Sequence, residues 1–209
     1  MTEERWISVV ATGEAALAPD LAIVSFAVSG SGKELAPTRD DVNARASAVL
    51  DKLRKLGIAD ADLNAPDVGI HPEYDYRKGQ RLTGYRVTRQ MTVKVRDLDQ
   101  LGDVLDGIVA AGANEVYGAQ MSAADPSAAD HEALRAAIGQ ARAKADALAD
   151  AGGVTIEGLA RVEEEPGSGP PVPRMRMLAA GAMAEGAQTE VAAGDLTVTR
   201  QIRAWFTIE

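Results

Sequence analysis

The residues best suited to chemistry in this chain are His71, Glu73 and Asp75, which alternate within the stretch PDVGIHPEYDY. Successive side chains of a β-strand point to opposite faces, so these three would share one face. An imidazole and two carboxylates on one face could bind a metal ion such as zinc. The competing interpretation is an exposed strand end beside the turn-forming Pro72, because three residues of one strand are an unspecific match. We therefore predict no metal and keep the three residues as candidates.

Other signatures of catalysis are missing from the sequence. The chain has no cysteine, which excludes a thiolate nucleophile and a thiolate metal site. No serine stands in a G-x-S-x-G elbow, and no glycine pattern of the dinucleotide-binding or phosphate-binding type follows a strand. His131 lies among polar residues at the start of a helix, where exposure to solvent explains it. We predict no catalytic residues, no cofactor and no enzymatic activity.

A small-ligand site is an alternative function for the same residues. Pockets for small molecules combine apolar walls with a few polar groups, and tyrosine supplies both. The ligand would enter a cleft between the helices and the sheet, lined by Tyr74, Tyr76, Tyr85 and Tyr117.

The charge of the chain is acidic, with 22 Lys and Arg against 31 Asp and Glu and a formal net charge of −9. Such a chain is repelled by nucleic-acid phosphates and by anionic lipid surfaces. No stretch approaches the ~20 apolar residues that span a bilayer. We predict neither nucleic-acid binding nor stable membrane insertion.

One predicted strand is basic, because Arg86, Arg89, Lys94 and Arg96 lie within or beside it. A solvated face accounts for these charges, and so does contact with acidic helices of a neighbouring subunit. Charge complementarity fixes the register of an interface. Arg86 and Arg96 are therefore candidate interface residues.

The elements that would position these residues follow from hydrophobic periodicity. Alternation of apolar and polar residues predicts strands at 6–12, 21–30, 66–76, 82–96, 113–122, from 154 onward and at 196–208. Apolar residues at three- and four-residue steps predict helices at 38–56, 97–111 and 127–150. This order predicts an α+β fold with about seven strands in mostly antiparallel sheets and three main helices packed on one face. We expect a single domain, residues 1–209.

The third predicted helix has an unusual composition, because alanine supplies much of its apolar stripe. Alanine allows a helix to approach a sheet or another helix closely. We predict that its buried side consists of Leu134, Ala137, Ile138, Ala141, Ala145 and Leu148.

The last predicted strand carries a further interface candidate. Its apolar residues, from Leu196 to Ile208, share one face, and Trp205 points to the other. An outward tryptophan either covers a helix end or anchors an interface between proteins.

Residues 166–193, rich in proline, glycine and methionine, match no regular element. We predict a flexible surface loop. Docking to a protein partner or a second subunit is the alternative, because methionine adapts to irregular apolar surfaces. The candidate residues there are Arg174, Met175, Arg176 and Met177. Weak membrane contact is a third interpretation.

The first ten residues, MTEERWISVV, contain neither a basic n-region nor an apolar h-region. A secretory leader has both. The expected location is therefore the cytoplasm.

Taken in order, several stretches resemble the SIMPL domain family. They are VVATGEAALAPDLAIV, LGIADADLNAPDVGIHPEYDY, GYRVTRQMTVKVRDLDQLGDVLDGIVAAGA, EALRAAIGQARAKADALADAGG and AAGDLTVTRQIRAWFTI. The resemblance covers nearly the whole chain, and it implies an α+β fold and a tendency to form homo-oligomers. It implies no catalytic site. We therefore expect a non-enzymatic, self-assembling protein with a scaffold, protective or protein-interaction role.

Overall fold

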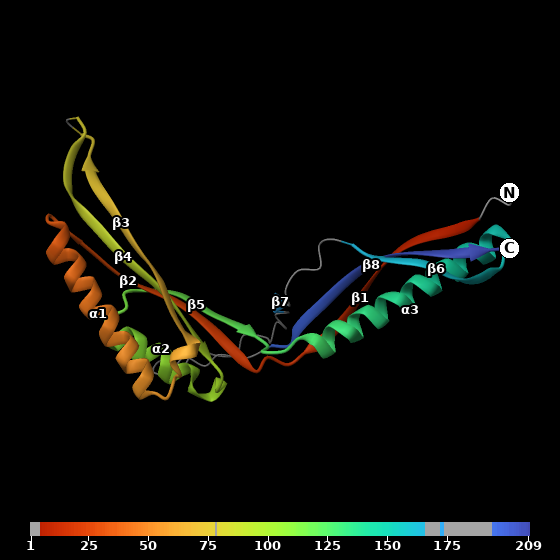
Figure 1. Cartoon of the computed structure of the whole chain (residues 1–209), viewed down its shortest axis with the longest axis horizontal. Helices are drawn as coiled ribbons and strands as arrows, with labels where there is room; N and C mark the ends of the chain where they lie inside the picture. The colour runs from red at the N-terminus through yellow and green to blue at the C-terminus, as the bar shows by residue number, and fades with distance from the viewer. Residues whose placement is uncertain (1–4, 78, 166–171, 174–193) are drawn as a thin grey trace, which may run out of the picture. The chain divides into compact units, whose positions relative to one another are not determined.

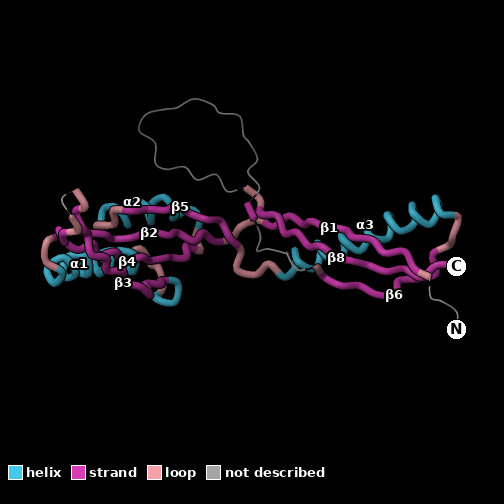
Figure 2. Tube along the Cα trace, turned by 90° about the horizontal axis from the view of Figure 1, so that it is seen from above, coloured by secondary structure: helices cyan, strands magenta, loops and turns pink. Residues whose placement is uncertain are grey.

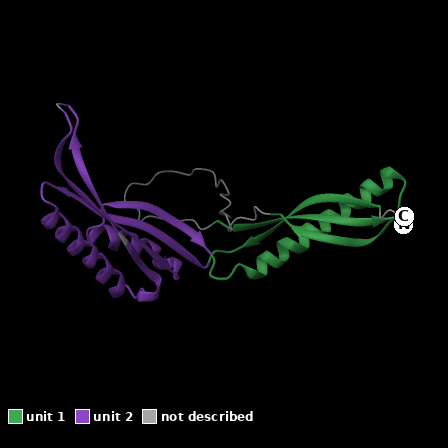
Figure 3. Ribbon diagram, turned by 45° about the horizontal axis from the view of Figure 1, so that its top comes forward, with its two compact units in different colours: residues 1–19, 123–179, 193–209 green, residues 20–122, 180–192 purple. Residues whose placement is uncertain are grey.

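The computed structural model describes residues 5–77, 79–165, 172–173 and 194–209. The chain divides into two compact units (Figure 3). Unit 1 contains the described parts of 1–19, 123–179 and 193–209, and unit 2 contains those of 20–122. Unit 2 is thus inserted in sequence between the first strand of unit 1 and the rest of it.

Unit 2 is a four-stranded antiparallel sheet with helices on one face (Figure 1). The strand order is β3-β4-β2-β5. Its elements are β2 (Leu21–Gly32), α1 (Leu35–Lys55), η1 (Asp60–Asp62), β3 (Leu63–Asp75), β4 (Arg81–Val95), η2 (Leu98–Gln100), α2 (Leu101–Ala110) and β5 (Glu115–Ser122). Helix α1 packs on β2 and β4, and α2 packs beside α1.

The core of unit 2 follows from alternation along its central strands. In β4, Val87, Met91 and Val93 are buried, whereas Arg86 and Lys94 on the opposite face are exposed. The predicted two-faced strand is therefore confirmed. The same period brings Phe26 of β2 opposite Met91.

The helix ends of unit 2 agree only partly with the sequence. Helix α1 begins at Leu35, three residues before the predicted start at residue 38, and the hydroxyl of Thr38 donates to the carbonyl of Glu34 at 2.7 Å. Gly57 follows the helix with φ of 87°, as a left-handed terminating residue should. Asp97 caps η2 by accepting from the N–H of Asp99, and Gln100 Nε2 donates to the same carboxylate.

Unit 1 is a second antiparallel sheet, with β8 between β1 and β6 (Figure 2). Its elements are β1 (Trp6–Leu17), α3 (Ser127–Gly152), β6 (Ile156–Glu164), β7 (Val172–Pro173) and β8 (Leu196–Ile208). The short β7 also pairs with β8. Helix α3 lies along β1 and β8.

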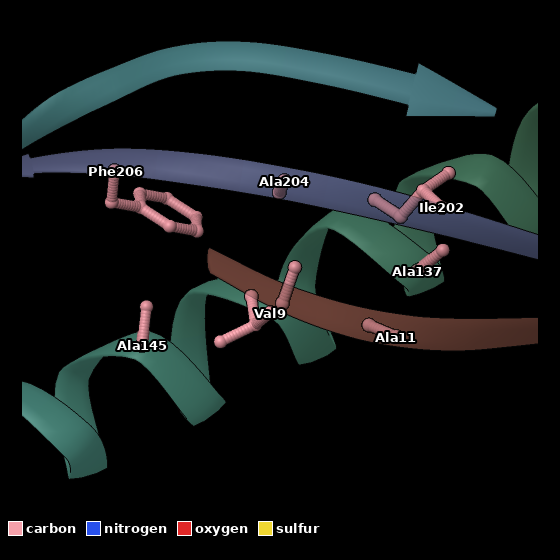
Figure 4. Packing of buried hydrophobic residues seen from close by; sticks show 8 residues of the cluster. Val9, Ala11, Ala137, Ala145, Ile202, Ala204 and Phe206 are labelled. Carbon is pink, nitrogen blue, oxygen red and sulfur yellow. The ribbon is translucent and has the colours of Figure 1, made fainter. Parts of the chain in front are cut away.

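Helix α3 meets its sheet through alanines spaced four residues apart (Figure 4). All of these are buried: Ala129, Ala133, Ala137, Ala141, Ala145 and Ala149. A Cβ on Gly13 of β1 would lie 2.0 Å from the carbonyl oxygen of Ala133, so strand and helix backbones are in direct contact. Val9, Ile202 and Phe206 fill the remaining core.

The predicted α+β class is confirmed, with eight strands in place of about seven. The strands form two sheets. The three helices therefore do not share one face: α1 and α2 lie on one face of the unit 2 sheet, and α3 covers one face of the unit 1 sheet. No helix in the described part of the chain is long and apolar enough to cross a bilayer.

Candidate functional site

The face of the unit 1 sheet opposite α3 is not covered by a helix in the described residues. Val9 and Ala11 of β1, and Ala204 and Phe206 of β8, point toward α3 (Figure 4). Their sequence neighbours must point the other way. We call this surface the open face; it consists of Trp6, Ser8, Val10, Arg203, Trp205 and Thr207.

Both tryptophans of the chain lie on the open face. In the register of β1 and β8, Trp205 stands opposite Ser8 and Trp6 opposite Thr207, so the two indoles are diagonal neighbours. Trp6 is 56% exposed, and Trp205 is half-buried. The Arg161 guanidinium lies 5.0 Å from the centre of the Trp205 ring.

Trp205 was expected from the sequence to point outward, and the structure places it so. Trp6 was missed as an interface candidate. The available signal was the alternation in WISVVA, which puts Trp6 on the side opposite Val9 and Ala11.

The two outer strands of this sheet differ in how their edges are protected. Charged side chains and bulges discourage pairing with a further strand. Strand β6 has both: Glu157, Arg161, Glu163 and Glu164 lie along it, and its register with β8 shifts twice. Strand β1 pairs with β8 over all twelve residues without a shift, and its only charged residue is Glu14. Lys144 Nζ donates to the carbonyl of Val10 at 2.9 Å, which satisfies part of the β1 backbone.

The basic residues predicted for an interface have partners within the chain. Arg86 Nε lies 3.0 Å from a carboxylate oxygen of Glu73, and Arg96 makes two hydrogen bonds of 2.8 Å to Asp62. The bonds from Arg96 hold the pKa of Asp62 below its usual value. These pairs give Arg86 and Arg96 partners within the chain, and a role of the two residues at an interface stays a prediction.

The three metal candidates are not gathered into a cluster. The extra residue at the register shift beside Glu73 is Thr83 of β4, so the alternation along β3 is kept. However, Glu73 is paired with Arg86, and Asp75 accepts from the N–H of Arg77. Within the described ranges, no group of three or more His, Asp or Glu side chains is placed to hold a metal ion.

The four tyrosines do not line one cleft. Tyr74 belongs to β3 and Tyr117 to β5, which are the opposite edges of the unit 2 sheet. Tyr85 lies on β4, and Tyr76 follows β3. A shallow hollow of about 490 Å³ occurs instead where β2 leads into α1, bordered by Ser31, Lys33 and Thr38 among others.

Sequence reasoning also missed a hydrogen-bonded network centred on Glu115. Ser29 Oγ donates to one carboxylate oxygen at 2.5 Å, and the Tyr117 hydroxyl donates to the other at 2.7 Å. Asn114 exchanges hydrogen bonds with the Ser29 backbone. The bonds from Ser29 and Tyr117 lower the pKa of Glu115, and the carboxylate raises that of Tyr117. No short motif marks this network, because β2 and β5 are far apart in sequence.

The remaining candidates, Arg174, Met175, Arg176 and Met177, lie outside the described residues, as does most of the predicted 166–193 loop.

Comparison with known proteins identifies the family. The profile of SIMPL, described as a protein of unknown function (DUF541), matches residues 7–206. The chain belongs to the SIMPL family. The match spans both units, so the SIMPL region comprises the two sheets and their helices.

Relatives of this SIMPL protein come from several bacteria. Uncharacterized protein YggE of Edwardsiella ictaluri is 34% identical over 82% of this chain and 74% of its own length. The 26 kDa periplasmic immunogenic protein of Brucella melitensis is 34% identical over 82% of this chain and 70% of its own length. Uncharacterized protein YggE of Escherichia coli K12 is 29% identical over 96% and 83%.

The predicted cytoplasmic location is wrong, because relatives are named as periplasmic proteins. The prediction rested on the first ten residues. A leader is removed during export, so the residues that open a folded chain do not report where it resides.

Proposed function

We propose that this SIMPL protein resides in the periplasm and acts there as a self-assembling interaction protein. The observation that carries the proposal is the continuous, unbulged β1 edge beside an open face with both tryptophans. The names of the Brucella relatives support the location.

Assembly would begin by pairing β1 with β1 of a second copy. Two antiparallel copies of one edge are related by a two-fold axis, so both copies use the same surface for the contact. The two sheets would become one continuous sheet, and the open faces would join. Trp6 would then lie at an end of the paired strands, beside the far end of β1 of the second copy, and a buried tryptophan supplies a large share of binding energy.

The proposed role involves no catalysis. Glu115, the carboxylate of the network described above, has both oxygens occupied and a lowered pKa. A general base working near neutral pH needs a raised carboxylate pKa. This contrast supports a structural network that ties β5 to β2.

The test is the native mass by light scattering, compared with the 21.9 kDa of one chain. We expect a multiple of that mass, and Trp6→Ser should raise the concentration needed for assembly about tenfold. The control is Val109→Ser, because Val109 is equally exposed at 57% but lies on α2 in unit 2. A wild-type monomer at all concentrations would refute self-assembly, and equal effects of the two variants would refute the β1 site.

A small-ligand function is the competing proposal, supported by the hollow at the junction of β2 and α1. Its size falls within the ~300–1,000 Å³ of ligand sites. A thermal shift with a metabolite panel, abolished by Thr38→Trp, would favour this function over self-assembly.

A further inference from the structure

The end of the β3–β4 hairpin projects beyond the rest of the unit 2 sheet (Figure 1). Strand β2 ends at Gly32, which pairs with Tyr85, whereas β3 and β4 remain paired as far as Asp75 and Arg81. The residues past Tyr85 extend about 10 Å at ~3.3 Å per residue. We call the described residues 74–77 and 79–82 the hairpin tip.

The hairpin tip combines exposed rings with free cations. Tyr74, Tyr76 and Leu82 are 39%, 71% and 44% exposed, and the two rings lie 6.2 Å apart. Tyr74 stands opposite Leu82 across the hairpin. In the described part of the chain, no carboxylate pairs with the guanidinium of Arg77 or Arg81, unlike Arg86 or Arg96.

From this combination we propose that the hairpin tip binds the surface of an anionic lipid bilayer. Tyrosine favours the headgroup region, where its ring is partly buried and its hydroxyl stays hydrated. Arginine near an anionic leaflet is attracted by the negative surface potential of the lipid headgroups. The proposal uses no residue of the open face and is independent of self-assembly.

The net charge of −9 is a sum over the whole chain, whereas the described residues of the hairpin tip contain two arginines and a single carboxylate, Asp75. Charges in solvent are screened beyond ~8–10 Å, about the length by which the tip projects. Asp75 lies within it, and its carboxylate accepts from the N–H of Arg77. The local balance is therefore basic.

A lipid surface fits the shape of the tip better than an acidic protein does. A stable protein interface buries ~800 Å² on each partner and needs ~20–30 residues a side. A convex hairpin end with three large apolar side chains offers far less. A headgroup layer deforms around such a tip, and the contact stays peripheral and reversible.

The experiment is cosedimentation of the full chain with vesicles at low ionic strength. One set is phosphatidylcholine, and the other mixes phosphatidylcholine and phosphatidylglycerol equally. We expect binding to the anionic vesicles only, weakened by salt. Arg77→Gln with Arg81→Gln should lower the partition coefficient about tenfold. The variant with Arg77→Lys and Arg81→Lys should retain vesicle binding, because the charge is kept. Tyr76→Ser should weaken vesicle binding.

The control is Arg39→Gln with Arg135→Gln, which removes the same charge from exposed helix positions. Absence of binding to anionic vesicles, or an equal loss in this control, would overturn the proposal. If the wild-type chain does not bind vesicles and the tip variant has a lower native mass than wild type, the hairpin tip binds an acidic surface of another copy instead. Trp6→Ser should leave vesicle binding unchanged.

Discussion

Glu115 adds side-chain hydrogen bonds to the backbone pairing of β5 with β2. Its two oxygens accept from Ser29 and Tyr117, and Ser29 is itself buried. Glu115→Gln should lower the free energy of unfolding by about 1–2 kcal/mol at neutral pH, because a charged acceptor is lost. Urea denaturation measures this, with the exposed Glu157→Gln of β6 as the control.

The pH dependence of that difference has a definite sign. The folded pKa of Glu115 lies below its unfolded value of 4.5, so the contribution is present above pH 4.5. It is lost as pH falls through the folded pKa, where Glu115 is neutral in both states. We expect the gap between wild type and Glu115→Gln to shrink in acid. A gap that grows in acid would contradict the network.

Gly13 is the residue that lets β1 touch α3. A Cβ there would meet backbone atoms of Ala133 and Ala137 at 2.0 and 2.3 Å, and backbone cannot turn aside. Gly13→Ala should therefore destabilise the protein by about 3 kcal/mol in chemical denaturation. Gly139→Ala, on α3 with no atom within 4 Å, should be neutral or stabilising by up to about 1 kcal/mol. A neutral Gly13→Ala would mean that α3 stands farther from β1.

At the scale of elements, strands were predicted better than helix packing. Alternation in β4 and β8 identified their buried faces, because each pleat has only two sides. In α3 the sequence favoured Leu134, Ile138 and Leu148 as well as alanines. The structure buries the alanines fully, packs the partly buried Leu134 and Ile138 against the same core, and leaves Leu148 52% exposed. Apolar size normally decides which stripe is buried, but the close approach of α3 to Gly13 gives the centre of the stripe to methyl groups and its border to Leu134 and Ile138.

The packing of α3 can be tested by two substitutions on one helix. Ala141→Leu should cost about 1–3 kcal/mol, because a larger side chain cannot fit between α3 and the sheet. Leu148→Gln should change stability by no more than about 0.5 kcal/mol. Thermal denaturation of both variants checks the order, and a larger loss for Leu148→Gln would mean that Leu148 is buried, as predicted from the sequence.

The hairpin of β3 and β4 shows why the metal candidates could not be settled from sequence. His71, Glu73 and Asp75 alternate along β3, because the extra residue at the register shift, Thr83, belongs to β4. Glu73 is paired with Arg86 and Asp75 accepts from the N–H of Arg77, and neither partner can be read from PEYDY alone.

At the scale of the molecule, each unit has its own sheet and its own core. Periodicity shows where strands are but not which strands pair, so two sheets were read as one domain. The single domain predicted from the sequence implies one unfolding transition, whereas the two separate cores lead us to expect two transitions in calorimetry. In hydrogen-exchange measurements, Gly13→Ala should speed the exchange of backbone amides in α3 and leave the exchange rates in α2 unchanged. One transition, or faster exchange in both helices, would mean that the chain unfolds as one domain.

The pairing of β1 with β8 has a consequence for how the chain is made. Trp6 stands opposite Thr207, so the strands that close unit 1 leave the ribosome at opposite ends of synthesis. All described elements of unit 2 emerge between them, and this unit can fold first. Through that interval β1 has no strand partner. A holding chaperone would therefore act on β1, and slow release of the C-terminal strand would expose a nascent chain to aggregation.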